Sequence, residues 1–262
     1  MIASLGMYDR AETHGANDRF WAAIRDGLRA AGVAAPEALT RGDAAYWPAW
    51  RARDLVFSQT CGFPFRAQLH TEVTLIGTPD YDLPGCPAGH YYSVFVARNT
   101  DPRDDLADFS GANFAYNEAS SQSGWAAPQN HAKALGIDLP PRLCTGGHRA
   151  SALAVAEGRA DLAAIDAISW AMLCRWERFA QDLREVARTS PPTPVLPYIA
   201  AKGVNADLYF DIIATAIADL SAQDRDTLMI KGVVRIAASA YLAVPTPAAP
   251  DQWATDQIAR PL

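Results

Sequence analysis

Short apolar segments alternate with amphipathic helical patterns along this chain, and that alternation limits the fold more than any other feature. Strands are expected at 2–5, 53–57, 73–77, 90–98, 112–116, 160–165, 183–189 and 197–201. Helices are expected at 14–31, 126–135, 149–157, 168–179, 207–220 and 223–231. Such alternation builds α/β folds whose strands are joined by right-handed crossovers. The pattern therefore predicts an α/β protein with a largely parallel sheet.

Two of the helical patterns also predict which side chains face the core. In the first, Phe20, Ile24 and Leu28 recur at a spacing of four residues, which places them on one helix face. In the helix expected at 207–220, the predicted inward residues are Leu208, Ile212, Thr215 and Ile217 or Leu220. Each of these helices is therefore expected to bury one face.

Length and charge restrict the partners of the chain. Its 262 residues suffice for one large domain or two smaller lobes. The formal net charge of −6 argues against non-specific binding to nucleic acid or to anionic membranes. The first residues favour a strand rather than a signal peptide, and no direct membrane insertion is expected. An anionic ligand would have to be held by local dipoles and hydrogen bonds.

The cysteines and lysines offer little for metal or covalent chemistry. The four cysteines have neither a metal-ligand spacing nor a C-x-x-C motif: Cys61, Cys86, Cys144 and Cys174. We expect buried thiols, with one or two disulfides as the alternative in an exported protein. Only three lysines stand beside twenty arginines, so few residues could form a Schiff base. No metal, cofactor or catalytic residue is expected.

The segment 117–125 combines the features of an anion-binding turn. Its sequence, Asn-Glu-Ala-Ser-Ser-Gln-Ser-Gly-Trp, lies between an expected strand and a helix with Pro128 in its first turn. A serine-rich turn that opens a helix presents backbone N–H groups and hydroxyls at the positive end of the helix dipole. The segment therefore predicts an anion site without a formal positive charge. The alternative is that Ser121 or Ser123 only caps the helix.

Polar residues also follow other expected strands. Residues 58–60 follow the strand at 53–57, Asp166 follows the strand at 160–165, and His148 opens a helix. In open α/β sheets, ligands bind outside the carboxyl ends of the strands. These groups are therefore expected to converge with residues 121–123 on one binding site.

The motifs and their order resemble those of the PhnD-like receptors of ABC transporters, which bind phosphate, phosphite or phosphonate. The similar segments are Ser-x-Ser-Gly at 121–124, Gly-His-Arg-Ala-Ser at 147–151, Gly-Arg-Ala-Asp-Leu-Ala-Ala-Ile-Asp at 158–166, and the stretches 3–8 and 58–65. The resemblance covers most of the chain. It implies a type 2 periplasmic-binding-protein fold, in which two α/β lobes are joined by two crossover strands and the ligand lies in the cleft between them.

The resemblance also implies boundaries and ligand-binding residues. Lobe one would be 1–92 plus 190–262 and lobe two 93–189, with crossovers near 92–96 and 186–189. The implied ligand-binding residues are Tyr8, Ser58, Gln59, Thr60, Ser121, Gln122, Ser123, His148 and Asp166. Tyr8 would wall the cleft.

Within that set, the resemblance gives three positions distinct roles. Residues 121–123 would cradle the phosphorus oxyanion, with Gln122 where a threonine is usual. His148 would contact the oxyanion as a neutral N–H donor, because a helix N-terminus disfavours the imidazolium. Asp166 would face the distal end of the ligand. The alternatives are a structural histidine bonded to backbone and a carboxylate that caps the next helix.

The implied function is that of a monomeric solute-binding protein. It would capture phosphonate, phosphite or phosphate in the periplasm for an ABC-transporter permease, and the sequence does not fix which. One alternative is an enzyme on the same fold, such as a menaquinone-pathway dehydratase or a pyrimidine-precursor synthase. A lysine or a Cys/His pair in the site would favour the enzyme, but His148 has no obvious acid–base partner nearby in the sequence. Another alternative is a cytosolic ligand sensor.

Overall fold

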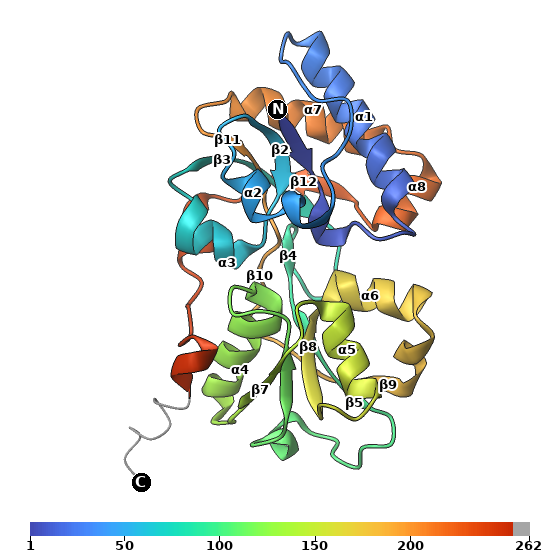
Figure 1. The fold of residues 1–262 in the computed structure, drawn as a ribbon, viewed down its shortest axis with the longest axis vertical. Helices are drawn as coiled ribbons and strands as arrows, with labels where there is room; N and C mark the ends of the chain where they lie inside the picture. The colour runs from blue at the N-terminus through green and yellow to red at the C-terminus, as the bar shows by residue number, and fades with distance from the viewer. Residues whose placement is uncertain (254–262) are drawn as a thin grey trace. The chain divides into compact units, whose positions relative to one another are not determined.

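The computed structural model describes residues 1–253, which form two compact units (Figure 1). Unit 1 comprises residues 1–90 and 194–243, and unit 2 comprises residues 91–193 with the described residues from 244 onward. Each unit contains a five-stranded sheet accompanied by helices. This arrangement confirms the predicted α/β class.

The chain passes between the units at three places. Two passages lie in β4 (His90–Tyr91) and β10 (Thr193–Pro194), which pair with each other. The third follows Ala243. The strands expected as crossovers instead belong to the sheet of unit 2. Residues 244–253, which the sequence placed in lobe one, contact unit 2, because the chain leaves unit 1 once more after its last helix.

The sheet of unit 1 is mixed. In sheet order its strands are β1 (Ile2–Ser4), β2 (Leu55–Gln59), β11 (Tyr198–Ala201), β3 (Val73–Asp80) and β12 (Gly232–Val234). Only β1 and β2 pair in parallel, whereas β11 is antiparallel to both of its neighbours. The helices of this unit are α1 (His14–Ala30), α2 (Trp47–Trp50), α3 (Gly62–Pro64), α7 (Ala206–Ala218), α8 (Ala222–Leu228) and α9 (Ala238–Leu242).

The sheet of unit 2 is mixed as well. Its order is β7 (Pro141–Cys144), β6 (Phe114–Tyr116), β8 (Leu162–Asp166), β5 (Ser93–Arg98) and β9 (Leu183–Arg188). The strand β6 is parallel to β7 and β8, and β5 is antiparallel to β8 and β9. The prediction of a largely parallel sheet is wrong, because β5 and β11 each enter a sheet after a passage and oppose both neighbours.

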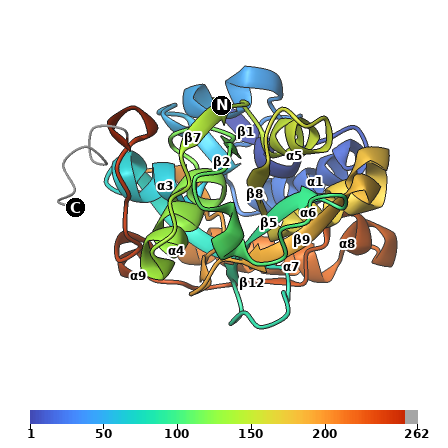
Figure 2. The same ribbon diagram turned by 90° about the horizontal axis from the view of Figure 1, so that it is seen from below.

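Three helices complete unit 2: α4 (Ala127–Leu135), α5 (His148–Ala156) and α6 (Ala167–Trp176). In both views α4 lies on one side of the sheet, and α5 with α6 on the other (Figure 1, Figure 2). The edge of the sheet from which β6 and β8 lead into helices therefore lies between the starts of α4, α5 and α6.

The predicted inward faces are right for α1 and wrong for α7. Phe20, Ile24 and Leu28 of α1 are buried. In α7 the buried residues are Tyr209, Ile213, Ala216 and Ile217, so only Ile217 of the expected set is among them. Ile212 packs against α1 instead: a Cβ added at Gly27 would lie 2.7 Å from its Cγ2 atom. Ile212 therefore faces α1 as an inward residue would, but it is only half-buried, and the buried face of α7 lies one residue further along the helix.

The structure also shows the state of the cysteines and whether its described residues include metal-ligand clusters or membrane-spanning helices. All four cysteines lie in the described residues as thiols without disulfides, and only Cys61 is buried, so the expectation of buried thiols is wrong for exposed Cys144 and Cys174. Within residues 1–253, no group of three or more His, Cys, Asp or Glu side chains is placed to hold a metal ion. In the same residues, no helix is both long and apolar enough to cross a bilayer.

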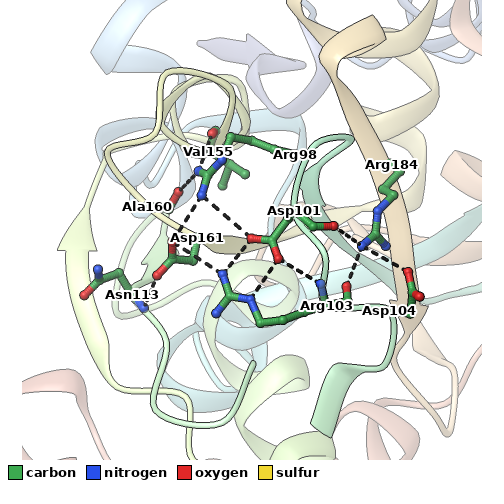
Figure 3. Close-up of polar contacts among 9 residues, drawn as sticks. All are labelled: Arg98, Asp101, Arg103, Asp104, Asn113, Val155, Ala160, Asp161 and Arg184. Carbon is green, nitrogen blue, oxygen red and sulfur yellow. Dashed lines mark hydrogen bonds and ion pairs between the residues drawn. The ribbon is translucent and has the colours of Figure 1, made fainter. Parts of the chain in front are cut away.

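A network of ion pairs fixes the loop that follows β5 (Figure 3). The Asp101 carboxylate, only 3% exposed, accepts hydrogen bonds from Arg103 at 2.8 and 2.6 Å. Arg98 donates to the carbonyl oxygens of Val155 and Ala160 at 3.0 and 2.6 Å. Arg184 of β9 donates to the carbonyl oxygen of Asp101 at 3.1 Å. The loop is thus tied to the turn before β8 and to β9.

Candidate functional site

The serine-rich segment forms the start of a helix in unit 2. The helix begins earlier than predicted, with a π-helical turn at Gln122–Ala126 that continues into α4. Ser121 is its N-cap, because its Oγ accepts the N–H of Gly124 at 2.9 Å. The first bond of the π turn joins the N–H of Ala126 to the carbonyl oxygen of Ser121 at 3.0 Å. We refer to residues 121–124 as the serine turn.

Gln122 and Ser123, which lie between the cap residue and Gly124, differ from Ser121 in their hydrogen bonding. The N–H of Ser123 precedes the first bond of the π turn, so it has no intrahelical carbonyl partner. Gln122 and Ser123 are both buried. Ser121 therefore has the capping role that the sequence allowed for either serine, and Ser123 does not share it.

Three side chains from three elements meet beside this turn. Ser123 lies in the π turn, His148 is the first residue of α5, and Asp166 is the last residue of β8. The Oγ of Ser123 is 2.8 Å from Nε2 of His148, and Oδ2 of Asp166 is 3.4 Å from the same nitrogen. Because β6 and β8 are parallel neighbours, the residues that follow them meet at one edge of the sheet. The structure thus brings together all three of these predicted residues.

The neighbours of His148 determine its protonation. Burial lowers the pKa of the imidazole, while the Asp166 carboxylate opposes that shift. The ring is therefore neutral at pH 7. The nearby carboxylate favours the tautomer with the proton on Nε2. In that tautomer Ser123 accepts the hydrogen bond, and its own hydroxyl hydrogen is left to donate to a ligand.

This geometry differs from that of a nucleophilic serine. In a Ser-His-Asp triad the serine donates to one imidazole nitrogen and the carboxylate holds the other. Here Ser123 and Asp166 both face Nε2 of His148. The second oxygen of Asp166 accepts the N–H of Ser169 at 2.9 Å, so the carboxylate also caps α6. The arrangement suits the donation of hydrogen bonds to an anion better than activation of a nucleophile.

Close packing at Gly124 holds the turn against its surroundings. A Cβ added at this residue would lie 1.9 Å from Oδ1 of Asn117 and 3.3 Å from Cε1 of His148. Only glycine fits there without displacing Asn117. Sequence reasoning gave neither Asn117 nor Gly124 a role, and a glycine inside the first helical turn was the available signal.

In unit 1, the four predicted residues occupy different environments. Ser58 is fully buried and its Oγ lies 2.7 Å from that of Ser4, so its hydroxyl serves contacts within the unit. Thr60 is also fully buried, and among the described residues its Oγ1 has no hydrogen-bond partner. The amide of Gln59 donates to the carbonyl oxygen of Leu196 at 3.2 Å.

Tyr8 and Gln59 line a small pocket within unit 1. Its volume is about 20 Å³, enough for roughly one water molecule. Tyr81 and Tyr198 contribute further to its wall, and the rings of Tyr8 and Tyr81 meet edge to face with centroids 5.8 Å apart. The wall of the pocket thus combines aromatic and aliphatic side chains, with Asn17 and Gln59 as amide side chains.

Known proteins resemble this chain in sequence and in fold. A family model described as "ABC transporter, phosphonate, periplasmic substrate-binding protein" matches residues 54–241. Among curated proteins, none matches the sequence. One similar solved structure is PhnD1 from Prochlorococcus marinus (MIT 9301) in complex with methylphosphonate, with a TM-score of 0.71 and 14% identity over 99% of this chain and 98% of that one.

Two further structures show the same fold. XAC2383 from Xanthomonas citri bound to chloride ion has a TM-score of 0.66 and 18% identity, over 99% of this chain and 98% of that one. A binding protein component of an ABC phosphonate transporter (PA3383) from Pseudomonas aeruginosa has a TM-score of 0.60 and 16% identity, over 89% and 80%. These likenesses confirm the predicted two-lobed fold.

Proposed function

Because the chain belongs to the phosphonate periplasmic substrate-binding proteins of ABC transporters, a family of binding proteins rather than enzymes, we propose that it captures a small phosphorus oxyanion. Phosphonate, phosphite and phosphate are the candidate ligands. The partner would be the permease of an ABC transporter and the compartment the periplasm, where the protein would act as a monomer.

The observation that carries this proposal is the pairing of Ser123 with a neutral His148 at the start of a helix. The hydroxyl and the N–H of Ser123 are donors at the positive end of the helix dipole. Hydrogen bonds to an ionised oxygen are stronger than those between neutral groups. A phosphorus oxyanion can therefore be held here without a lysine or arginine.

Within unit 1, we propose Tyr8, Gln59 and Thr60 as ligand-contacting residues. Thr60 offers a buried hydroxyl that lacks a partner among the described residues, and Tyr8 and Gln59 offer polar groups at the wall of a pocket. Ser58 is bonded to Ser4, so we assign it a supporting role behind these contacts.

A thermal-shift screen tests the proposed ligand class directly. Methylphosphonate, phosphite and phosphate would each be added to the protein, with sulfate as the control. A ligand at about 100 times its dissociation constant adds roughly 2.7 kcal/mol to the stability of the folded state. We expect at least one phosphorus oxyanion to stabilise the protein and sulfate to leave it unchanged. Equal stabilisation by sulfate, or none by any of the three, contradicts the proposal.

Ser123→Ala separates binding from capping. We expect methylphosphonate affinity to fall by about 1.5–3 kcal/mol, the range for a hydrogen bond to a charged group, with the free energy of unfolding changed by less than about 1 kcal/mol. Calorimetric titration and urea denaturation measure the two quantities. The matched variant is Ser121→Ala, which removes the cap and should lower stability by about 0.5–2 kcal/mol. Lost stability with unchanged affinity in Ser123→Ala would make Ser123 purely structural.

Asp166→Asn tests how sulfate is excluded. A carboxylate 3.4 Å from Nε2 of His148 repels a dianion bound there unless the anion carries a hydrogen that Asp166 can accept. Sulfate carries none at pH 7. We expect Asp166→Asn to admit sulfate and to bind methylphosphonate more weakly than the wild type, as measured by calorimetry. Because asparagine also caps helices, stability should change little. If the variant still rejects sulfate and keeps full methylphosphonate affinity, Asp166 is only a helix cap.

A further inference from the structure

The last described residues of the chain pack directly behind the serine turn. We call residues 244–253 the C-terminal strap; it follows α9 and lies along α4 (Figure 1). The carbonyl oxygen of Pro245 accepts a hydrogen bond from Nδ2 of Asn130 in α4 at 2.8 Å. The carbonyl oxygen of Ala248 accepts one from Nε1 of Trp125 at 3.2 Å. The strap therefore contacts the residue that follows the serine turn and the helix that continues it.

The hydrogen bond from Trp125 to the strap involves the residue directly after the serine turn. Trp125 follows Gly124 directly and is only 1% exposed, and its ring packs against that of Tyr116 with centroids 5.2 Å apart. A buried indole N–H without an acceptor costs free energy, so the side chain needs a partner at this position. Ala248, far away in the sequence, supplies that partner through its carbonyl oxygen. This hydrogen bond links the strap to the residue directly after Gly124.

Both ends of the strap are fixed. Trp253 packs against the hydrophobic core of unit 2 that contains Trp125. At the other end, Tyr241 of α9 is 1% exposed in unit 1, and its hydroxyl donates to the carbonyl oxygen of Val195 at 2.7 Å. Only residues 242–244 separate Tyr241 from Pro245. Within unit 2 the strap is held through Pro245, Ala248 and Trp253.

We propose that the C-terminal strap positions the serine turn through Trp125, so that anion affinity depends on a segment outside the anion site. The ligand part of this inference rests on the proposed function. The structural part does not, because the order of the turn can be measured in the free protein.

The test uses two variants of the full chain. Asn130→Ala combined with Trp253→Ala releases the strap from α4 and from the core, and Trp125→Phe keeps a ring but removes the indole N–H. Each should speed hydrogen exchange at the amides of Gly124 and Ala126, which bond to Ser121. Each should also weaken methylphosphonate binding about tenfold, which corresponds to the loss of roughly one hydrogen bond. Lys133→Ala, on the same helix, is the matched control and should change neither measurement.

Combining these variants shows whether the strap acts on the serine turn through Trp125. If the strap acts through Trp125, adding Trp125→Phe to the released strap should change exchange and affinity little further. Restoring an aromatic ring with Trp253→Phe should recover most of the loss. The inference is overturned if the released strap lowers the melting temperature but leaves exchange at Gly124 and Ala126 unchanged, or if the effects of the two variants are fully additive. If even the wild type ignores methylphosphonate, the proposed ligand fails, and the exchange comparison still decides the role of the strap.

Discussion

Gly124→Ala is expected to weaken methylphosphonate binding by ten- to a hundredfold, because the added methyl group has no room. Its Cβ would lie 1.9 Å from Oδ1 of Asn117, well inside van der Waals contact. Either Asn117 or the serine turn must move, and overpacking of this kind costs about 1–3 kcal/mol. Movement of the turn displaces the Ser123 hydroxyl, which lies 2.8 Å from His148. Calorimetry with methylphosphonate measures the loss.

Asn117→Ala supplies the control for this prediction. Alone it should change affinity little, since among the described residues Oδ1 of Asn117 has no hydrogen-bond partner. When Asn117→Ala is combined with Gly124→Ala, most of the affinity should return, because the clashing atom is gone. In addition, alanine favours a helix over glycine by about 1 kcal/mol. A double variant as weak as Gly124→Ala alone would show that the clash with Asn117 is not the cause.

The fold was predictable where patterns are strong. The spacing of Phe20, Ile24 and Leu28 gave both the extent of α1 and its buried face. Strand β7, with Pro141 at its start, was missed because it is a half-exposed edge strand whose sequence has no continuous apolar stretch. Strand direction was mispredicted because a single sequence does not show where the chain passes from one sheet to another.

The site was predictable as a set of positions but not as a set of roles. Polar residues after strands mark the edge where ligands bind, and this placed Ser123, His148 and Asp166 together. Which serine caps the helix depends on where the first turn begins, and a π turn shifted that start to Gln122. The contact between Trp125 and the C-terminal strap could not be predicted, because the acceptor of its indole N–H lies more than a hundred residues further along the chain.

Asp101→Asn is expected to lower the free energy of unfolding at pH 7 by about 2 kcal/mol. Two hydrogen bonds from the Arg103 guanidinium hold the pKa of the Asp101 carboxyl at about 2, below its ordinary value of 3.8. Lowering a pKa by one corresponds to about 1.36 kcal/mol in favour of the charged form. The variant keeps an oxygen that can accept from Arg103 but has no charge. Urea denaturation followed by tryptophan fluorescence measures the difference.

The same pair predicts how stability depends on pH. Because the pKa is depressed in the folded state, the unfolded chain binds more protons between pH 3.8 and about 2. The contribution of Asp101 is therefore complete above pH 3.8 and is lost as the pH falls toward 2. We expect wild type and Asp101→Asn to differ at pH 7 and to converge in acid.

Asp104→Asn is the matched control, because that carboxylate is 93% exposed and lies 3.6 Å from Arg184. An exposed pair of this kind contributes about 1 kcal/mol or less, so the control should follow the wild-type curve closely at every pH. The network in Figure 3 joins the loop after β5 to β9 and to the turn before β8, the strand that ends in Asp166. If Asp101→Asn and Asp104→Asn have the same small effect at pH 7, the buried ion pair does not hold this loop, and the fold of unit 2 depends on its apolar core instead.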